Sequence, residues 1–258
     1  MKKFLVFALV LLSNAIQAIA ADAPAIEVNQ ANFAKAKEVY KCKYAYSPIT
    51  IDGIISDDAW KYAKPVDFHT PINMNTPIDK TRGWLLWDDN YIYVAFKSYD
   101  KDIWSLFTKR DSWAYQEDCL ETFFWTDFSK GTYYNFEITV TGTIYDSFNR
   151  KRFGGGAEIR RWSAWNAENL KVATHTYGTL NNPYDKDKYV TMEVKIPFSD
   201  LPTLKGKSPK QGESWKFTLA RCNYSVDLPI GHEETCSAPL TKFDLHYYYD
   251  YQTLLFVK

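Results

Sequence analysis

The sequence is poor in the residues that build metal centres and nucleophilic active sites. It has 4 cysteines and 4 histidines in 258 residues, and the cysteine spacing matches no zinc-binding pattern. The histidines are scattered, at positions 69, 175, 232 and 246, and no Gly-x-Ser-x-Gly motif is present. The sequence therefore excludes a zinc-finger type of domain and gives no support to a serine hydrolase.

The chain also lacks net charge, because 31 basic residues balance 31 acidic ones. A neutral chain has no electrostatic footprint for nucleic acid or for an anionic membrane surface. We expect neither of these partners.

The first 20 residues hold an apolar run that is too short to span a membrane. Lys2 and Lys3 precede the run at residues 4–12, and the small-residue pattern Ala18-Ile19-Ala20 follows it. This order is typical of a cleaved export signal. We therefore expect an exported protein, periplasmic, cell-surface or extracellular, with no membrane insertion.

Export permits disulfides, but four cysteines allow three complete pairings and the sequence cannot choose between them. We favour Cys222–Cys236, which would close one long loop and stabilise the fold by roughly 3 kcal/mol in the chain-entropy model. Cys119 falls inside a predicted strand, which favours a buried free thiol.

Aromatic residues are abundant, at 17% of the chain. They favour flat, weakly polar ligands, although a tyrosine-rich β core would give the same composition. Alternation of apolar and polar residues predicts many strands, with three in succession over residues 117–145 and no βα alternation or internal repeat. We predict an all-β antiparallel sandwich, jelly-roll-like, over residues 39–258, preceded by a linker over 21–38. The other predicted strands cover 40–51, 83–87, 91–99, 189–196, 214–223 and 254–257.

Several segments, in this order, resemble carbohydrate-binding module family 9 and its family 9-like relatives. They include ITIDGIISDDAW (49–60), WLLWDDNYIYVAFKSYD (84–100), EDCLETFFWTD (117–127), YYNFEITVTGTIYD (133–146) and YVTMEVKIPFSDL (189–201). The closing segment 243–256 also resembles the family, with Gln252 in place of its usual glycine. The resemblance covers nearly the whole chain after the signal.

The resemblance implies a two-sheet sandwich that clamps a sugar ring between two tryptophans, with polar side chains on the hydroxyl groups. By motif position, Trp113, Gln116 and Asp118 match the first tryptophan and its neighbours, Glu121 matches the second acidic residue, and Arg110 would supply a cation. The second tryptophan is missing from its usual place, which residues 235–239 occupy. Either Trp162 or Trp165 substitutes for it, or the clamp is incomplete.

Calcium is the only cofactor that we expect. The resemblance implies structural calcium, and oxygen-rich turns are natural calcium sites. Asp52, Asp57 and Asp58 form one such cluster, although acidic residues in turns are more often simply solvated. We expect no organic cofactor.

Three functions remain in contention at the sequence level. The first is a secreted, non-catalytic carbohydrate-binding protein that assists capture or degradation of xylan-like glycans, in association with polysaccharide-degrading enzymes. The second is a haem-carrying, DOMON-like electron-transfer domain, for which Met192 faces inward and Met74 lies in a loop. The third is a stand-alone glycoside hydrolase, for which Glu137 would have to pair with Glu121, since Asp118 and Glu121 point to opposite faces of one strand.

Overall fold

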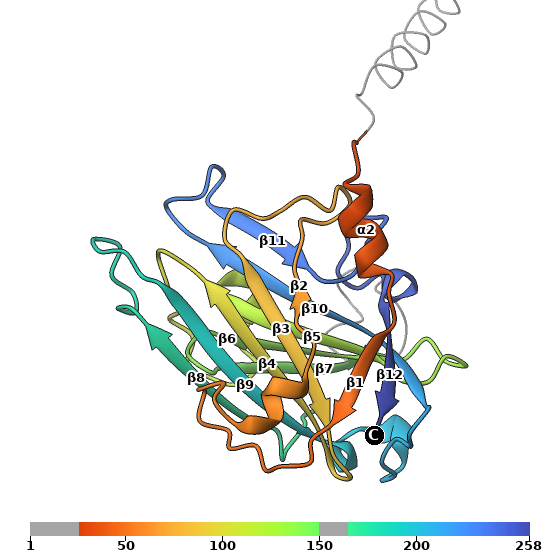
Figure 1. The fold of residues 1–258 in the computed structure, drawn as a ribbon. Coiled ribbons are helices and arrows are strands. Elements are labelled where there is room, and N and C mark those ends of the chain that lie inside the picture. Colours follow the sequence, from red (N-terminus) through yellow and green to blue (C-terminus); the bar gives the residue numbers. More distant parts are fainter. Residues whose placement is uncertain (1–25, 150–164) are drawn as a thin grey trace, which may run out of the picture.

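The computed structural model describes residues 26–149 and 165–258 (Figure 1). The predicted export signal over 1–20 and the candidate Trp162 lie outside these residues. The strands are β1 (Tyr40–Tyr44), β2 (Val66–Asp67), β3 (Thr81–Trp87), β4 (Tyr91–Tyr99), β5 (Cys119–Trp125), β6 (Tyr133–Thr139), β7 (Ile144–Asn149), β8 (Lys171–Tyr177), β9 (Tyr189–Pro197), β10 (Ser214–Tyr224), β11 (His232–Cys236) and β12 (Gln252–Val257). The helical elements are α2 (Gln30–Ala36) and the 3-10 turns η1 (Asp58–Tyr62), η2 (Ala114–Gln116), η3 (Phe198–Asp200), η4 (Pro202–Leu204) and η5 (Tyr248–Asp250).

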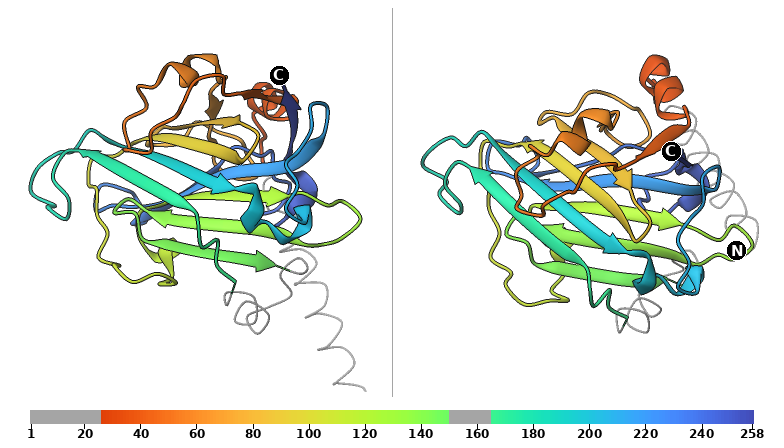
Figure 2. Two further views of the ribbon diagram at one scale, coloured as in Figure 1. Left: turned by 90° about the horizontal axis from the view of Figure 1, so that it is seen from below. Right: turned by 60° about the horizontal axis from the view of Figure 1, so that its bottom comes forward.

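The strands form one hydrogen-bonded path in the order β7-β6-β5-β10-β12-β1-β3-β4-β9-β8, with β11 beside β10 and β2 beside β3. The path curls over into two layers. The left view of Figure 2 shows the green strands β5, β6 and β7 in a layer beneath the yellow and cyan strands β4 and β9. The sandwich prediction is therefore confirmed. Its pairings are antiparallel except at β1, which runs parallel to both β12 and β3 and joins the two layers.

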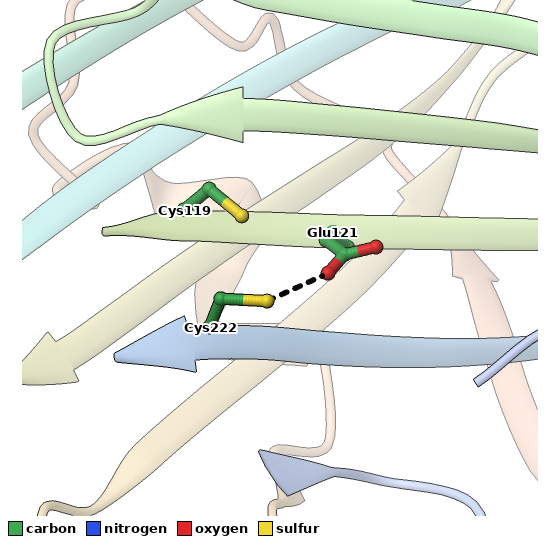
Figure 3. A group of neighbouring side chains, drawn as sticks. All are labelled: Cys119, Glu121 and Cys222. Atoms are coloured by element: carbon green, nitrogen blue, oxygen red, sulfur yellow. Dashed lines mark hydrogen bonds between the residues drawn. The ribbon is translucent and has the colours of Figure 1, made fainter. Parts of the chain in front are cut away.

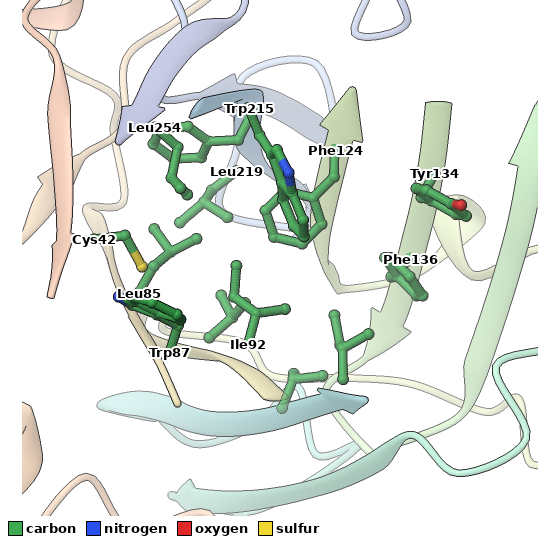
Figure 4. Close-up of a cluster of buried hydrophobic side chains, with 14 of the residues drawn as sticks. Cys42, Leu85, Trp87, Ile92, Phe124, Tyr134, Phe136, Trp215, Leu219 and Leu254 are labelled. Carbon is green, nitrogen blue, oxygen red and sulfur yellow. The ribbon is translucent and has the colours of Figure 1, made fainter. Parts of the chain in front are cut away.

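Alternation along the strands fills the space between the layers. On β9 the apolar residues at alternate positions, Val190 to Ile196, point inward, and all are 0–1% exposed. From the opposite layer Phe124 and Trp215 meet with ring centroids 5.5 Å apart. Figure 4 shows side chains from both layers in this core. Much of the aromatic content therefore belongs to the core.

One polar side chain on the outer face of β9 is buried. Alternation along the strand places Glu193 on the face opposite the core, but it is 0% exposed. The segment 45–62 crosses the outer face of β9, and the Glu193 carboxylate accepts hydrogen bonds from Trp60 Nε1 at 2.8 Å and from the amide of Gly53 at 3.1 Å. A polar residue on an alternating strand is buried here because a loop covers it.

Part of the predicted linker is ordered against the sandwich. Residues 30–36 form α2, whose first turn is capped by the Asn29 side chain. Gln252 on β12 donates from Nε2 to the carbonyl of Ala36 at 2.7 Å, which ties the end of the helix to the sheet.

The cysteines differ from prediction in one respect. All four are buried free thiols, as expected for Cys119. The predicted Cys222–Cys236 bridge is wrong, because the β10–β11 register places Cys222 opposite Glu234 and Cys236 opposite Ala220. The two cysteines are therefore diagonal neighbours, two positions out of step along the strands.

Of the helices that the structure describes, none is both long and apolar enough to cross a membrane.

Candidate functional site

A pocket of about 510 Å³ lies on the outer face of β5, β6, β7 and β10. Strand register explains its composition. Glu121 on β5 is paired with Glu137 on β6, which is paired with Tyr145 on β7. Residues two positions along a strand share a face, so Asn135 and Ser147 extend the same surface. The pocket is completed by Cys222, Glu234, Asn149 and Tyr115, and by the chain segment Phe243, Asp244, Leu245 and His246.

Buried acidic groups dominate the floor of this pocket. Burial, with the nearby Glu137 charge, raises the pKa of Glu121 well above its usual range. Burial likewise raises the pKa of Glu137 to about 7, and it also raises the pKa of Glu234. Within the described ranges, none of these three carboxylates forms an ion pair with a basic side chain. The floor therefore favours neutral, hydrogen-bonding ligands or a cation.

Asn135 leaves an acceptor without a protein partner. Its Nδ2 donates to Glu137 Oε1 at 2.7 Å, which fixes the amide orientation. Its Oδ1 is buried and receives no hydrogen bond from the residues that the structure describes, and the residue is only 1% exposed. A buried unsatisfied acceptor is unfavourable by about 1–3 kcal/mol, so a hydroxyl or amide donor entering the pocket would find a prepared partner.

Aromatic faces stand at the rim. Tyr115, from η2, is 43% exposed, and Phe243 is 63% exposed. Trp113 stacks on Tyr115, with centroids 6.3 Å apart and rings inclined by 21°. Flat apolar faces beside planar polar groups are the combination that recognises a sugar ring.

The predicted site residues divide into those that reach the pocket and those that do not. Glu121 lines it, whereas Trp113 and Gln116 lie exposed beside it. Asp118 needs correction, because it is 1% exposed and its oxygens accept from the amides of Trp104 at 2.9 Å and Tyr224 at 2.7 Å. It ties the loop at Trp104 to the end of β10 and is not available to a ligand at this surface.

Two further candidates have structural contacts instead. Arg110 donates from Nη2 to both carboxylate oxygens of Asp146, at 2.8 and 2.9 Å. Trp165 packs on the core, with its ring 5.4 Å from that of Tyr134. Trp165 therefore does not supply the second tryptophan of a clamp.

The three aspartates predicted to hold calcium each have a local partner. Asp52 accepts from the amide of Ile54, Asp57 accepts from the amide of Thr50, and Asp58 pairs with Lys61. In the two described ranges, a different group of three acidic, cysteine or histidine side chains has ligand atoms within 4.8 Å of one another. It consists of Cys119, Glu121 and Cys222. Calcium at Asp52, Asp57 and Asp58 stays a prediction. The inward Met192 of the haem alternative is packed in the apolar core.

Tyr115, Asn135 and Glu137 line the pocket but were not among the predicted binding residues. Tyr115 stands two residues after Trp113, in the loop that the sequence singled out. Asn135 and Glu137 alternate on β6 with core residues such as Phe136. That polar alternation next to Glu121 was the available signal.

A family model described as carbohydrate family 9 binding domain-like matches residues 51–227. The chain belongs to this family. The fold is also found among solved structures. A candidate carbohydrate-binding protein from Bacteroides uniformis aligns with a TM-score of 0.62 at 14% identity, over 85% of this chain and 99% of its own.

Two structures of a family 9 carbohydrate-binding module from Caldicellulosiruptor kristjanssonii are similar as well. The complex with cellotriose has a TM-score of 0.56 at 16% identity, over 85% of this chain and 94% of its own. The complex with glucose has a TM-score of 0.53 at 17% identity, over 84% of this chain and 95% of its own. A comparison with curated protein sequences found no match.

Proposed function

We propose that this chain is an exported, non-catalytic member of the family whose pocket over β5, β6, β7 and β10 binds a sugar ring. The observation that carries the proposal is the buried, unpaired Oδ1 of Asn135 beside Glu121 and Glu137. Sugar hydroxyls donate hydrogen bonds to such acceptors. Family membership supports carbohydrate as the ligand class.

The size of the pocket suits one or two sugar rings. Its volume of about 510 Å³ lies within the usual range for small-ligand sites. Tyr115 and Phe243 offer faces for the C–H groups of a ring, while the floor offers acceptors. Because the similar Caldicellulosiruptor modules are complexes with cellotriose and glucose, gluco-oligosaccharides are the first probes, followed by xylan-derived ones.

A binding role fits the two central glutamates better than hydrolysis does. Glycosidases place two carboxyl groups on either side of the scissile bond. Glu121 and Glu137 are instead direct cross-strand partners that project from one face of one sheet. They would touch the same side of a ligand. In this proposal the protein holds glycan, and associated polysaccharide-degrading enzymes cleave it.

Isothermal titration of the chain from residue 21 onward with glucose, cellotriose and xylo-oligosaccharides tests the proposal. Tyr115→Ala should weaken binding by about 1–2 kcal/mol, or about 5–30-fold, because it removes an aromatic face of the pocket. Trp113→Ala should have a smaller effect, because Trp113 supports Tyr115 without lining the pocket.

Tyr184→Ala is the matched control, since Tyr184 is 95% exposed and lies outside the pocket. Equal affinities for Tyr115→Ala and the unmodified chain would place the ligand elsewhere. Release of reducing sugar from these probes by the purified chain would contradict the non-catalytic role.

A further inference from the structure

Cys119 and Cys222 face each other across the β5–β10 pair at the floor of the pocket. They are direct partners in the strand register, and both are buried. Their sulfur atoms lie within 4.8 Å of each other, although 102 residues separate them in the sequence.

Glu121 brings a carboxylate to the same place. It lies two residues after Cys119 on β5 and so projects from the same face. Its Oε1 accepts a hydrogen bond from Cys222 Sγ at 3.3 Å, and the ligand atoms of all three residues lie within 4.8 Å of one another (Figure 3). Glu121 is 3% exposed and Cys119 is 1% exposed, which leaves little room for solvent around them.

Two further acidic side chains lie beside this group. Glu137 is opposite Glu121 on β6, and Glu234 is opposite Cys222 on β11. In the part of the chain that the structure describes, no lysine or arginine forms an ion pair with any of the three glutamates. Buried carboxylates are ordinarily paired or bound to a metal.

Two sulfurs and a carboxylate at this spacing suit a particular kind of ion. Zn²⁺ takes cysteine sulfur and glutamate oxygen in tetrahedral geometry, whereas Ca²⁺ and Mg²⁺ require oxygen ligands only. Soft thiolates also select against the hard cations. The chemistry of the donors therefore favours a thiophilic divalent cation.

We propose that Cys119, Cys222 and Glu121 bind a divalent cation of the zinc class. Both thiols lose their protons to solvent when the ion binds. Cys222 and Glu121 also line the pocket, as does Glu234, which is opposite Cys222 on β11. The site lies beneath the proposed sugar pocket but does not depend on sugar binding.

Cobalt substitution tests this site directly. The chain is purified with a reductant, stripped with a chelator and titrated with Co²⁺. We expect one equivalent to give thiolate-to-cobalt charge-transfer absorption and the intense visible bands of tetrahedral coordination, and Zn²⁺ to displace it. Absence of these bands from the reduced chain would overturn the proposal.

Matched variants identify the ligands. Cys119→Ser and Cys222→Ser, separately, should weaken Co²⁺ binding by at least about 10–100-fold, a loss that even outer partners of metal ligands produce. The double variant Cys42→Ser/Cys236→Ser removes the other two buried thiols and should keep the full signal. Cobalt binding as strong in Cys119→Ser or in Cys222→Ser as in the unmodified chain would overturn the assignment.

Glu121→Gln keeps both thiols and guards against variants that fail to fold. It should retain charge-transfer absorption but bind Co²⁺ more weakly.

The rival chemistry is oxidation, since a disulfide can join cysteines that are direct cross-strand partners. Peptide mapping that finds a Cys119–Cys222 disulfide in protein purified without reductant and with Zn²⁺ present would contradict the metal site, and two free thiols with bound zinc would support it.

Discussion

Single residues in the interior divide into those that hold the loops and those that leave a group for a ligand. Asp118 has both oxygens occupied by backbone amides. Asn135 has its amide nitrogen occupied and its oxygen unpaired. Both are 1% exposed, so burial alone does not separate structural from functional residues. Hydrogen-bond satisfaction does.

Arg221 gives a prediction at this scale. Its Nη2 contacts Asp100 Oδ2 at 2.6 Å, and its Nη1 donates to the carbonyl of Tyr99 at 2.8 Å. Arg221 and Asp100 are 3% and 2% exposed. Arg221→Gln should lower the free energy of unfolding by about 3–5 kcal/mol at pH 7, because it leaves a buried carboxylate unpaired. Urea denaturation measures this change.

Lys64→Gln is the comparison, because Lys64 pairs with Glu38 at 3.2 Å while both side chains are more than 60% exposed. This exposed pair should contribute less than about 1 kcal/mol. Similar losses in the two variants would mean that the buried pair has no special weight.

At the scale of elements, the segment 45–62 is held against β8 and β9 by a close backbone approach. Gly53 has φ +84, and a Cβ there would stand 2.7 Å from the backbone carbon of Thr174. Gly53→Ala should therefore destabilise the fold by about 2–4 kcal/mol, adding a backbone clash to the 1–2 kcal/mol of the left-handed conformation.

Gly206→Ala separates these two contributions. Gly206 has φ +74 but nothing within 4 Å of its Cβ position. It should show the conformational cost alone when both variants are unfolded in urea. Equal destabilisation by the two substitutions would show that the approach to Thr174 is not tight in solution.

The sequence predicted those elements whose own pattern is regular. The hairpin of β3 and β4 and the strand β9 carry apolar residues at alternate positions, and all three were identified. By contrast β8, with little burial on either face, was missed. Its hydrogen bonds to β9 hold it in the sheet, and a partner strand is not visible in local periodicity.

The site follows the same division. Glu121 was found because it belongs to a family motif. The pocket as a whole depends on the β5–β6–β7 register and on residues 243–246, which come from a distant part of the chain. The Cys119–Cys222 contact arises from the β5–β10 register in the same way, so spacing along the sequence gave no sign of a metal site.

For the whole molecule, the curled sheet separates two environments. The space between the layers is filled by aromatic and aliphatic side chains, while the outer face of β5, β6 and β7 holds buried titratable groups. Burial raises the pKa of the Glu137 carboxyl group from 4.5 to about 7. At a pH between these two values, the folded chain binds a proton that the unfolded chain does not. Its contribution to stability therefore falls as pH rises through that window.

His246 has the opposite sign and gives a prediction for the molecule's response to acid. Burial lowers its pKa from 6.5 to about 4, and its ring lies between those of Phe123 and Tyr133. Between these values the unfolded chain binds a proton that the folded chain does not. Stability from this group is therefore present above pH 6.5 and is lost as pH falls toward 4.

His246→Gln should remove that acid sensitivity. At about 1.4 kcal/mol per pKa unit, the difference in unfolding free energy between the unmodified chain and this variant should shrink by at most about 3 kcal/mol from pH 7 to pH 4. Partial exposure of the ring will make this change smaller.

Urea denaturation at several pH values, with a chelator present, measures the difference in unfolding free energy. The pH dependence that the buried carboxylates contribute, which has the opposite sign, is common to both chains and cancels in this difference. His175→Gln, at an exposed histidine, is the comparison variant. Parallel pH profiles for His246→Gln and the unmodified chain would show that the histidine is protonated in the folded pocket.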